Sequence, residues 1–329
     1  MDVIESAGEA TILESLAASP INDAGSVVSI GAYDGVHLGH QIVLAAVRSR
    51  ALELGAASAV VTFDRHPAEV VRPESAPRLL CDLDQKLALL EATGLDVAVV
   101  VRFDDERATE TAEHFVRSLL FDTLRTRSVI VGEDFHFGHR RQGNVALLEE
   151  LGEELGFEVR GHHLVAADGS DARDDAHVSS TAIRRALVEG RLADANAMLG
   201  RPHQMFGPVV HGDERGRTIG FPTANVAIPD RMLMPADGIY AGHLVDHSVA
   251  GGVVHPAAVY VGHRPTFYDN SAATVLEVHC LDEPGDLYDR AVSVMFEHRL
   301  RGDERFDGVD DLAAQLALDC VAASVALGG

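Results

Sequence analysis

The sequence predicts a chain of two structural classes, α/β followed by β: a Rossmann-like parallel-sheet domain, then an antiparallel β-barrel with a C-terminal helix. Two patterns support this prediction. In the first half, runs of valine and isoleucine alternate with helical segments of about 10 to 15 residues, which is typical of a parallel sheet covered on both faces. From Met205 to about Leu300, short strands are separated by turns rich in glycine, proline and aspartate, which is typical of an antiparallel barrel.

Four strands and four helices are expected in the first half. The strands are predicted over residues 26–30, 58–63, 96–103 and 128–132, and the helices over residues 40–54, 85–94, 111–124 and 143–156. Ligands bind beyond the carboxyl ends of parallel strands. Polar segments lie at three of these ends, so we expect residues 29–44, 62–67 and 132–138 to meet at one site.

The second half begins with a polar loop over residues 168–177 and one predicted helix over residues 179–200. Ser179, Ser180 or Thr181 can cap this helix, and Gly200 ends it. Barrel strands are expected over residues 206–212, 238–246, 256–262, 274–281 and 291–300, and a last helix over residues 309–327. The pattern changes between residues 190 and 203, so the predicted domains are residues 1–190 and 203–329, joined by a linker over 191–202.

The charge of the chain excludes several kinds of partner and site. The formal net charge is −24, and the 27 basic residues include a single lysine, Lys86. An acidic surface repels nucleic acid and anionic membranes. A Walker A loop needs a Gly-Lys-Ser/Thr sequence, and the chain has none. Lys86 is predicted to lie on a helix face without a chemical role, so any nucleotide phosphate must contact arginine, histidine, backbone N–H groups or a metal ion.

The cysteines and the apolar runs predict a cytoplasmic protein. Cys81, Cys280 and Cys320 are far apart and form no CxxC pair, which argues against a disulfide framework and a cysteine zinc site. The first residues do not resemble a secretory signal, and no apolar run approaches the ~18 residues that span a bilayer. We expect a protein without a membrane or nucleic-acid partner, either a monomer or a weak homo-oligomer.

His37 and His40 lie where the first predicted strand gives way to a helix, within DGVHLGH. Backbone N–H groups at a helix N-terminus attract anions, imidazoles there can donate hydrogen bonds to a phosphate, and glycines allow a ligand to approach the backbone closely. Two other interpretations stay open. The histidines can be incidental to a turn, or they can bind zinc, although no third ligand with the usual spacing lies nearby.

The segment SSTAIRR is a second candidate for phosphate binding. The hydroxyls of Ser180 and Thr181 lie at a predicted helix start, and Arg184 lies one turn further on, where all three could face a phosphate. A simple N-cap followed by a solvated arginine is the commoner meaning of such a pattern.

The order of the motifs resembles a known family. An HxGH motif followed by SSTxIR is similar to the signature of the nucleotidylyltransferases. The segments IGAYDGVHLGH, TFDRHP, VGEDFHFGHRRQG, SSTAIR, GRTIGFPTANV, GHRPTF and LRGDERFD follow one another as in bacterial bifunctional riboflavin kinase/FAD synthetases, over about residues 26–322. The resemblance implies an FMN adenylyltransferase (FAD synthetase) domain over residues 1–190 and a riboflavin kinase domain over residues 203–329.

By this resemblance, the first domain would join FMN to AMP, with Mg²⁺ as cofactor. The FMN phosphate would attack the α-phosphorus of ATP and pyrophosphate would leave, while the protein positions the reactants and stabilises charge. The implied catalytic residues are His37, His40 and Arg184, and the implied nucleotide-binding residues are Gly31, Asp34, Gly39, Asp134, Phe135, Ser180 and Thr181. Gly138 and Gly143 would flank the loop that follows GEDF.

The second domain would phosphorylate riboflavin with ATP. Glu277 would be the base that takes the proton from the 5′-hydroxyl of the ribityl chain during attack on the γ-phosphate. Thr223 and Asn225 would organise Mg²⁺ and the ATP phosphates, Gly212, Gly216 and Gly220 would let a loop wrap the nucleotide, and Arg301 would lie on the flavin side. Without the resemblance, Glu277 reads as a solvent-facing carboxylate and Arg301 as a surface arginine in a salt bridge.

Three residues depart from the family pattern. Tyr33 stands in place of a phenylalanine, Arg65 in place of a proline, and His177 in place of a basic residue before SST. A neutral His177 would weaken the synthetase activity above the pKa of a free imidazole, roughly 6.5. Two alternative functions stay open: an adenylyltransferase for another substrate, such as phosphopantetheine or nicotinamide mononucleotide, and a flavin-binding regulatory protein without catalysis. The GFPTAN segment argues against the first, and the matched catalytic positions argue against the second.

Overall fold

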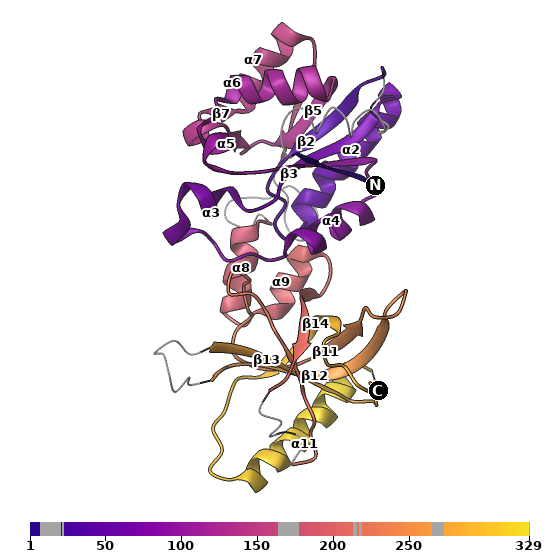
Figure 1. Cartoon of the computed structure of the whole chain (residues 1–329), viewed down its shortest axis with the longest axis vertical. Coiled ribbons are helices and arrows are strands. Elements are labelled where there is room, and N and C mark those ends of the chain that lie inside the picture. The colour runs from indigo at the N-terminus through magenta and orange to yellow at the C-terminus, as the bar shows by residue number, and fades with distance from the viewer. Residues whose placement is uncertain are drawn as a thin grey trace. The chain divides into compact units, whose positions relative to one another are not determined.

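The computed structural model describes residues 1–6, 21, 23–163, 178–212, 216, 219–264 and 273–328. Contacts divide the chain into two units, Met1–Ser179 and Ser180–Gly329, each of which is described by itself (Figure 1). His177, whose charge is expected to affect the synthetase activity, lies outside the described residues. The division groups the segment that contains Ser180, Thr181 and Arg184 with the second unit.

The first unit contains a six-stranded, fully parallel sheet. The strands lie in the order β1 (Asp2–Ser6), β4 (Val97–Val101), β3 (Ala57–Phe63), β2 (Ser26–Ile30), β5 (Thr126–Gly132) and β8 (Glu158–His162). The four expected strands are confirmed. The sheet also has two edge strands, β1 and β8, which the sequence analysis did not predict; most of their residues are polar or charged, or glycine.

Helices cover both faces of this sheet, as expected. The helices are α2 (Leu38–Leu54), α3 (Pro67–Val71), α4 (Leu83–Ala92), α5 (Asp105–Thr109), α6 (Ala112–Phe115) with a π-helical continuation over Val116–Thr123, and α7 (Val145–Leu155). Alternate strand residues point to opposite faces. Thus Val27 packs in one core cluster with Leu44 and Leu90, whereas its neighbour Val28 packs in the other with Leu120 and Leu148.

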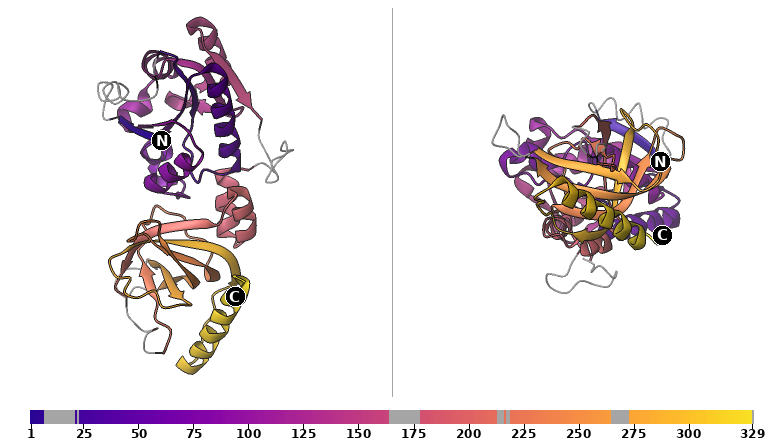
Figure 2. Two further views of the ribbon diagram at one scale, coloured as in Figure 1. Left: turned by 90° about the vertical axis from the view of Figure 1, so that its right-hand side faces the viewer. Right: turned by 90° about the horizontal axis from the view of Figure 1, so that it is seen from below.

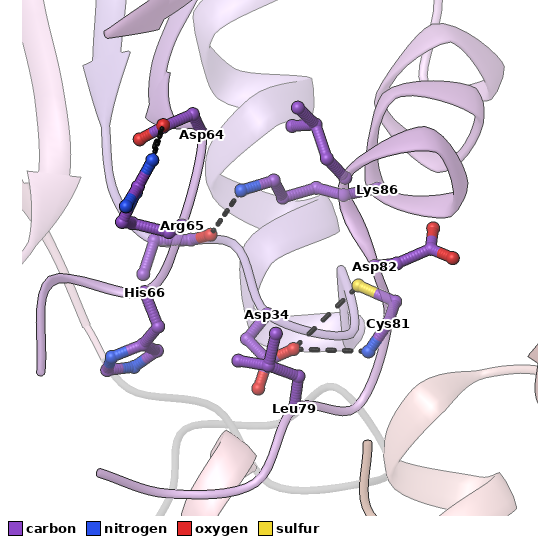
Figure 3. Close-up of a pocket in the computed structure, with 10 residues that line it drawn as sticks. Asp34, Asp64, Arg65, His66, Leu79, Cys81, Asp82 and Lys86 are labelled. Atoms are coloured by element: carbon purple, nitrogen blue, oxygen red, sulfur yellow. Dashed lines mark hydrogen bonds and ion pairs between the residues drawn. The ribbon is translucent and has the colours of Figure 1, made fainter. Parts of the chain in front are cut away.

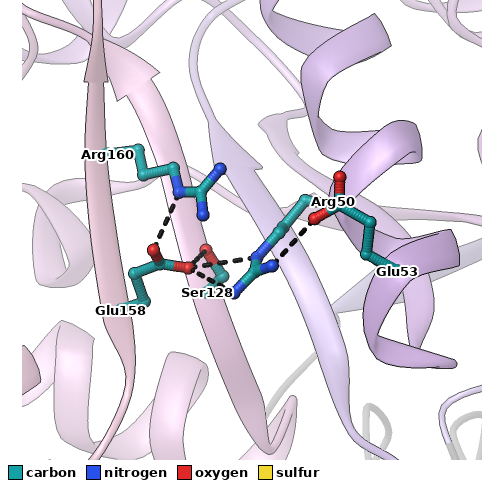
Figure 4. A network of polar contacts seen from close by, with 5 residues as sticks. All are labelled: Arg50, Glu53, Ser128, Glu158 and Arg160. Carbon is teal, nitrogen blue, oxygen red and sulfur yellow. Dashed lines mark hydrogen bonds and ion pairs between the residues drawn. The ribbon is translucent and has the colours of Figure 1, made fainter.

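A polar network joins α2 to the far edge of the sheet (Figure 4). Glu158 of β8 accepts a hydrogen bond from Arg50 of α2 at 3.1 Å and from Arg160 at 2.8 Å, and it also lies 3.4 Å from the Ser128 hydroxyl of β5. Arg50 bonds Glu53 one turn further along α2. These contacts fix an edge strand that has few apolar residues of its own.

The second unit opens with two helices instead of one. The expected single helix over residues 179–200 is wrong: α8 (Ser180–Val188) and α9 (Leu192–Leu199) are separated at Gly190, which has a φ of 72°. The Arg191 amide donates back to the Ala186 carbonyl and closes α8. Glycine adopts such a left-handed conformation without steric penalty, and this ends the helix.

The rest of the second unit is a closed barrel with one helix beside it (Figure 2). The strand order is β10 (Ala224–Val226), β13 (Ala273–Cys280), β12 (Val253–Arg264), β11 (Gly238–Asp246), β14 (Ala291–Arg301) and β9 (His203–Val210). All neighbouring strands are antiparallel, so the expected fold class is confirmed. Helix α11 (Val309–Ala326) packs Ala323 against Ala241 and Ala258 on the outside of the barrel. The division of the chain into functional domains at residues 190–203 stays a prediction.

Buried His203 makes the stability of the barrel depend on pH. Its side chain is 2% exposed, and burial, together with the charge of Arg201, lowers its pKa to about 4. In the unfolded chain the pKa is about 6.5, so below that pH the unfolded state binds a proton that the folded state does not bind. We expect the free energy of unfolding to fall by about 3 kcal/mol as the pH falls from 6.5 to 4. Urea unfolding at both pH values, with His203→Gln beside the wild type, tests this; an equal pH dependence in the variant would contradict it.

Candidate active sites

Three polar segments of the first unit leave the sheet at adjacent strand ends. Strand β2 pairs with both β3 and β5 in parallel, so the segments that follow these three strands lie at one edge of the sheet. The segments are residues 31–37, 64–67 and 133–138. The chain order reverses at β2, and such a reversal in an open parallel sheet is the usual place for a ligand.

The turn between β2 and α2 has a strained backbone. Tyr33, Gly35 and Val36 have positive φ angles of 50°, 81° and 38°. A positive φ is unfavourable for Tyr33 and above all for β-branched Val36, and such strain persists only where the surroundings enforce it. Here Tyr33 and Val36 are buried, and the Tyr33 hydroxyl donates to the Ser29 hydroxyl at 2.6 Å. The hydroxyl that distinguishes Tyr33 from phenylalanine therefore anchors the turn.

The carboxylate of Asp34 holds the same turn from the other side. One oxygen, Oδ1, accepts the Leu80 amide at 2.9 Å and the Cys81 amide at 3.2 Å. The Gly35 amide in turn contacts the Cys81 sulfur at 3.1 Å. The side chain of Asp34 is 5% exposed, so its contacts are mainly with the protein. A direct nucleotide contact by Asp34 stays a prediction.

His37 and His40 lie side by side at the start of α2. His37 is the N-cap, and its Nδ1 faces the His40 amide at 3.4 Å, while the two rings stack with centroids 3.6 Å apart. Gly39 leaves room for this stack, because a Cβ at that position would lie 3.3 Å from the His37 ring. The two imidazole rings therefore lie together at the N-terminus of α2.

His40 is a neutral imidazole with an unused nitrogen. Its Nδ1 is buried and has no hydrogen-bond partner among the described residues. Burial and the neighbouring His37 lower the pKa of His40 well below its usual value. Buried polar atoms are almost always paired. An orphaned nitrogen at a helix N-terminus thus fits a polar ligand that arrives there, and a phosphate is the ligand such a position favours.

A small pocket lies beside this turn, at the end of β3 (Figure 3). It is lined by Ala32, Asp34, Asp64, Arg65, His66, Leu79, Cys81, Asp82, Leu83 and Lys86. Arg65, one of the departures from the family pattern, binds the adjacent Asp64 at 2.9 Å, so its charge is paired. The Asp64 carboxylate also accepts the Phe103 amide at 2.8 Å.

Lys86 lies on a helix, as expected, but its side chain is buried there. It lies on α4 with 6% exposure, and its Nζ donates to the Phe63 carbonyl at 2.6 Å and contacts the Ala32 carbonyl at 3.4 Å. Burial lowers its pKa, while the charges of Cys81, Asp34, Asp64 and Glu69 oppose this effect. The single lysine therefore ties the end of β3 to the turn that leads to the histidines.

Lys86→Met is expected to destabilise the first unit. Methionine has a similar length but cannot donate, so the Phe63 carbonyl would remain buried without this partner. Such a loss amounts to about 1–3 kcal/mol of unfolding free energy. Urea unfolding of Lys86→Met beside the wild type measures this loss. An unchanged free energy of unfolding would contradict the role.

The segment after β5 packs through its aromatic rings. Phe135 stacks on Phe137 with centroids 5.4 Å apart, and the Phe135 amide donates to the Gly132 carbonyl in the turn that contains Asp134. A Cβ at Gly143 would lie 2.7 Å from the Phe137 ring, so glycine is required there. This packing fixes the path of the GEDF segment beside β2. Nucleotide binding by Asp134 and Phe135 stays a prediction.

Ser180, Thr181 and Arg184 lie in the first turns of α8, as the sequence predicts for a helix start. They belong to the second unit and the histidines to the first, and the two units are described separately. Phosphate binding by Ser180, Thr181 and Arg184 stays a prediction.

The barrel brings Thr223, Asn225 and Glu277 together. Asn225 of β10 pairs directly with Glu277 of β13, and the Thr223 hydroxyl lies 3.5 Å from the Glu277 carboxylate. Glycines surround this group. A Cβ at Gly212 would lie 2.4 Å from the Asn225 amide group, and one at Gly216 would lie 2.3 Å from the Phe221 carbonyl, while Gly220 has a φ of 89°.

Arg301 lies at the end of β14 and binds α11. Its guanidinium makes two hydrogen bonds to the Asp319 carboxylate, at 2.7 and 2.9 Å, and Gln315 also donates to Asp319. Asp319 is 4% exposed, so this ion pair is largely buried. Arg301 thus fixes the segment between β14 and α11, and its predicted place on the flavin side stays a prediction.

Comparison with known proteins decides the family. Residues 19–182 match the FAD synthetase family and residues 199–327 match the riboflavin kinase family. The bifunctional riboflavin kinase/FMN adenylyltransferase of Haemophilus influenzae is 38% identical over 90% of this chain and 92% of its own length. The chain belongs to the bifunctional riboflavin kinase/FAD synthetase family. The Pseudomonas fluorescens member of this family is 39% identical over 91% of this chain and 92% of its own length.

A solved structure confirms the architecture of this riboflavin kinase/FAD synthetase. A chain from Streptococcus pneumoniae, named a macrolide-efflux protein, covers 97% of both chains with a TM-score of 0.81 and 28% identity. Among the residues described here, no helix combines the length and the apolar character that crossing a membrane requires. The two family domains follow one another in the order that the motifs predict.

Proposed function

We propose that the first unit of this riboflavin kinase/FAD synthetase adenylylates FMN at the His37–His40 turn. Three observations support this: the helix N-terminus, the orphaned Nδ1 of His40 and the convergence of three polar segments at β2. The FMN phosphate attacks the α-phosphorus of ATP, the bond to the β-phosphate oxygen breaks, and pyrophosphate leaves. His37 and His40 donate hydrogen bonds to the phosphate oxygens, which gain charge in the transition state. The family motif implies a phosphate-binding role for Ser180, Thr181 and Arg184 as well.

The barrel phosphorylates riboflavin with Glu277 as general base. The carboxylate takes the proton of the 5′-hydroxyl as its oxygen attacks the γ-phosphorus of ATP, and ADP leaves. The Thr223 hydroxyl lies 3.5 Å from the Glu277 carboxylate. Thr223 would therefore contact the ATP phosphates close to the base. Because Gly212 and Gly216 have no side chain, the backbone at these two positions can lie close to Asn225 and Thr223.

The oxygen atoms around Glu277 fit Mg²⁺. A hydroxyl, a side-chain amide oxygen and a carboxylate are hard ligands of the kind that Mg²⁺ prefers, and substrate phosphates complete its coordination in kinases. Thr223 and Asn225 would hold the ion. When bound, it would neutralise charge on the ATP phosphates. We place the enzyme in the cytoplasm, with small-molecule substrates and no nucleic-acid or membrane partner, as a monomer or a weak homo-oligomer.

The main support for the kinase assignment is the pairing of Asn225 with Glu277 beside Thr223, since it brings together two motifs that are distant in sequence.

A chromatographic time course with riboflavin, ATP and Mg²⁺ tests the whole proposal. We expect FMN to form first and FAD afterwards. FMN that accumulates without FAD would point to another substrate for the first unit, and binding of riboflavin without consumption of ATP would point to a flavin-binding protein.

A further inference from the structure

One row of residues crosses the outside of the barrel through Glu277. Cross-strand neighbours face the same side of a sheet. Asn225 pairs with Glu277, Glu277 pairs with Tyr260, Tyr260 pairs with Ile239, and Ile239 pairs with Arg301. The row therefore places Tyr260 beside the base, on the side away from Asn225. Ala258 lies two residues before Tyr260 on the same strand and packs against α11 outside the barrel. Residues two apart on a strand face the same side, so Tyr260 also faces outward.

The base divides this row into two sides. Thr223, Asn225 and the glycines lie on one side of Glu277, and this is the side proposed to bind the ATP phosphates. In phosphoryl transfer, the acceptor oxygen approaches the phosphorus in line with the leaving group, so donor and acceptor lie on opposite sides of the reacting phosphorus. A base that takes the acceptor's proton must contact the acceptor. The neighbour of Glu277 on the other side, Tyr260, is thus placed where the acceptor alcohol lies.

The Tyr260 hydroxyl has the chemistry to contact an alcohol. Its ring lies over Gly262, because a Cβ at Gly262 would be 2.1 Å from the hydroxyl oxygen. The hydroxyl interacts with the Asp303 carboxylate, so its proton is directed there, and its oxygen can accept a hydrogen bond from elsewhere. Burial raises the pKa of Tyr260 to about 12, with the charges of Asp303, Glu277 and Asp237 adding to the effect. The phenol therefore stays protonated at any working pH.

We propose that Tyr260 contacts the substrate in the kinase site and accepts a hydrogen bond from a hydroxyl group of the acceptor's polyol chain. This inference rests on the proposed role of Glu277 as base. Tyr260 would help to choose a flavin that carries a hydroxylated side chain over a flavin that lacks one. A site that bonds a substrate hydroxyl discriminates against analogues without it, because its own polar group is then left unpaired.

The test is Tyr260→Phe, which removes one oxygen atom and keeps the ring. We expect the KM for riboflavin to rise by about five- to tenfold, as for the loss of one hydrogen bond, with little change in the KM for ATP. Lumiflavin has the flavin ring but no polyol chain, so its inhibition constant should not change. An unchanged KM for riboflavin would overturn the proposal. A rise in the KM for ATP alone, or a matching rise in the lumiflavin inhibition constant, would also overturn it.

Two controls separate this proposal from its alternatives. Tyr240→Phe removes a phenol oxygen from the neighbouring strand, where the hydroxyl bonds the Ala236 carbonyl and the ring is fully buried. That variant should keep the wild-type KM for riboflavin, and FMN adenylylation should stay normal in both variants. Glu277→Gln tests the assignment of the base separately. If Glu277→Gln still forms FMN, Glu277 is not the base. If Glu277→Gln forms no FMN and Tyr260→Phe keeps the wild-type KM for riboflavin, only the role of Tyr260 is refuted.

Discussion

His40→Ala is expected to stop the formation of FAD while the formation of FMN continues. The neutral imidazole of His40 lies at the N-terminus of α2 with a buried nitrogen that has no partner in the described part of the chain. Alanine removes this donor from the proposed phosphate site. Loss of one preorganised donor to a developing charge reduces the rate by about 10²- to 10³-fold. The measurement is the rate of FAD formation from supplied FMN and ATP, with FMN formation from riboflavin followed in the same samples.

The controls for His40→Ala use a second histidine and the pH profile. His114 lies on α6 with 59% of its side chain exposed, so His114→Ala should keep the wild-type rate. Because burial and the neighbouring His37 lower the pKa of His40 well below its usual value of about 6.5, His40 is already neutral at pH 6.5 and does not titrate above it. A decline in FAD formation above pH 6.5 would thus come from another group, as expected for His177. FAD formation within fivefold of the wild type in His40→Ala would contradict the assignment.

The sequence predicts the buried parts of the fold better than its edges. Strands β2 to β5 are almost entirely buried and contain runs of apolar residues, such as Val97–Val101, which can be recognised without a structure. Strand β8 (EVRGH) has only one strongly apolar residue, and it is held instead by parallel pairing with β5 and by the Arg50–Glu158 contact. Such contacts between distant segments leave no local pattern.

The site residues show the same limit. His37 and His40 are predictable because they lie close together in sequence, where a strand gives way to a helix. Lys86 has a helical context that fits a surface position equally well, and only the fold brings its Nζ to the Phe63 carbonyl. Its rarity is the one signal available, since it is the single lysine among 27 basic residues. Tyr260 has no sequence signal, because its proposed role comes from its cross-strand register with Glu277.

Glu277→Gln is expected to stop the formation of FMN from riboflavin while supplied FMN is still converted to FAD. Glutamine has nearly the same shape as glutamate but cannot take a proton from the 5′-hydroxyl. General base catalysis by a positioned side chain contributes about 10²- to 10⁴-fold. The substitution keeps an oxygen toward Thr223, so the barrel should remain folded. FMN formation measured by chromatography gives the rate, and FAD formation from FMN in the same preparation reports on the first unit.

The matched control for this variant is Glu283→Gln, an exposed glutamate that follows β13. It changes the net charge by the same amount, so it separates a general charge effect from loss of the base. The chain carries 51 acidic residues, and removal of one charge at random should leave the rate unchanged. FMN formation by Glu277→Gln at more than about a tenth of the wild-type rate would exclude Glu277 as the base. The inference about Tyr260, which rests on Glu277 as the base, would then fall as well.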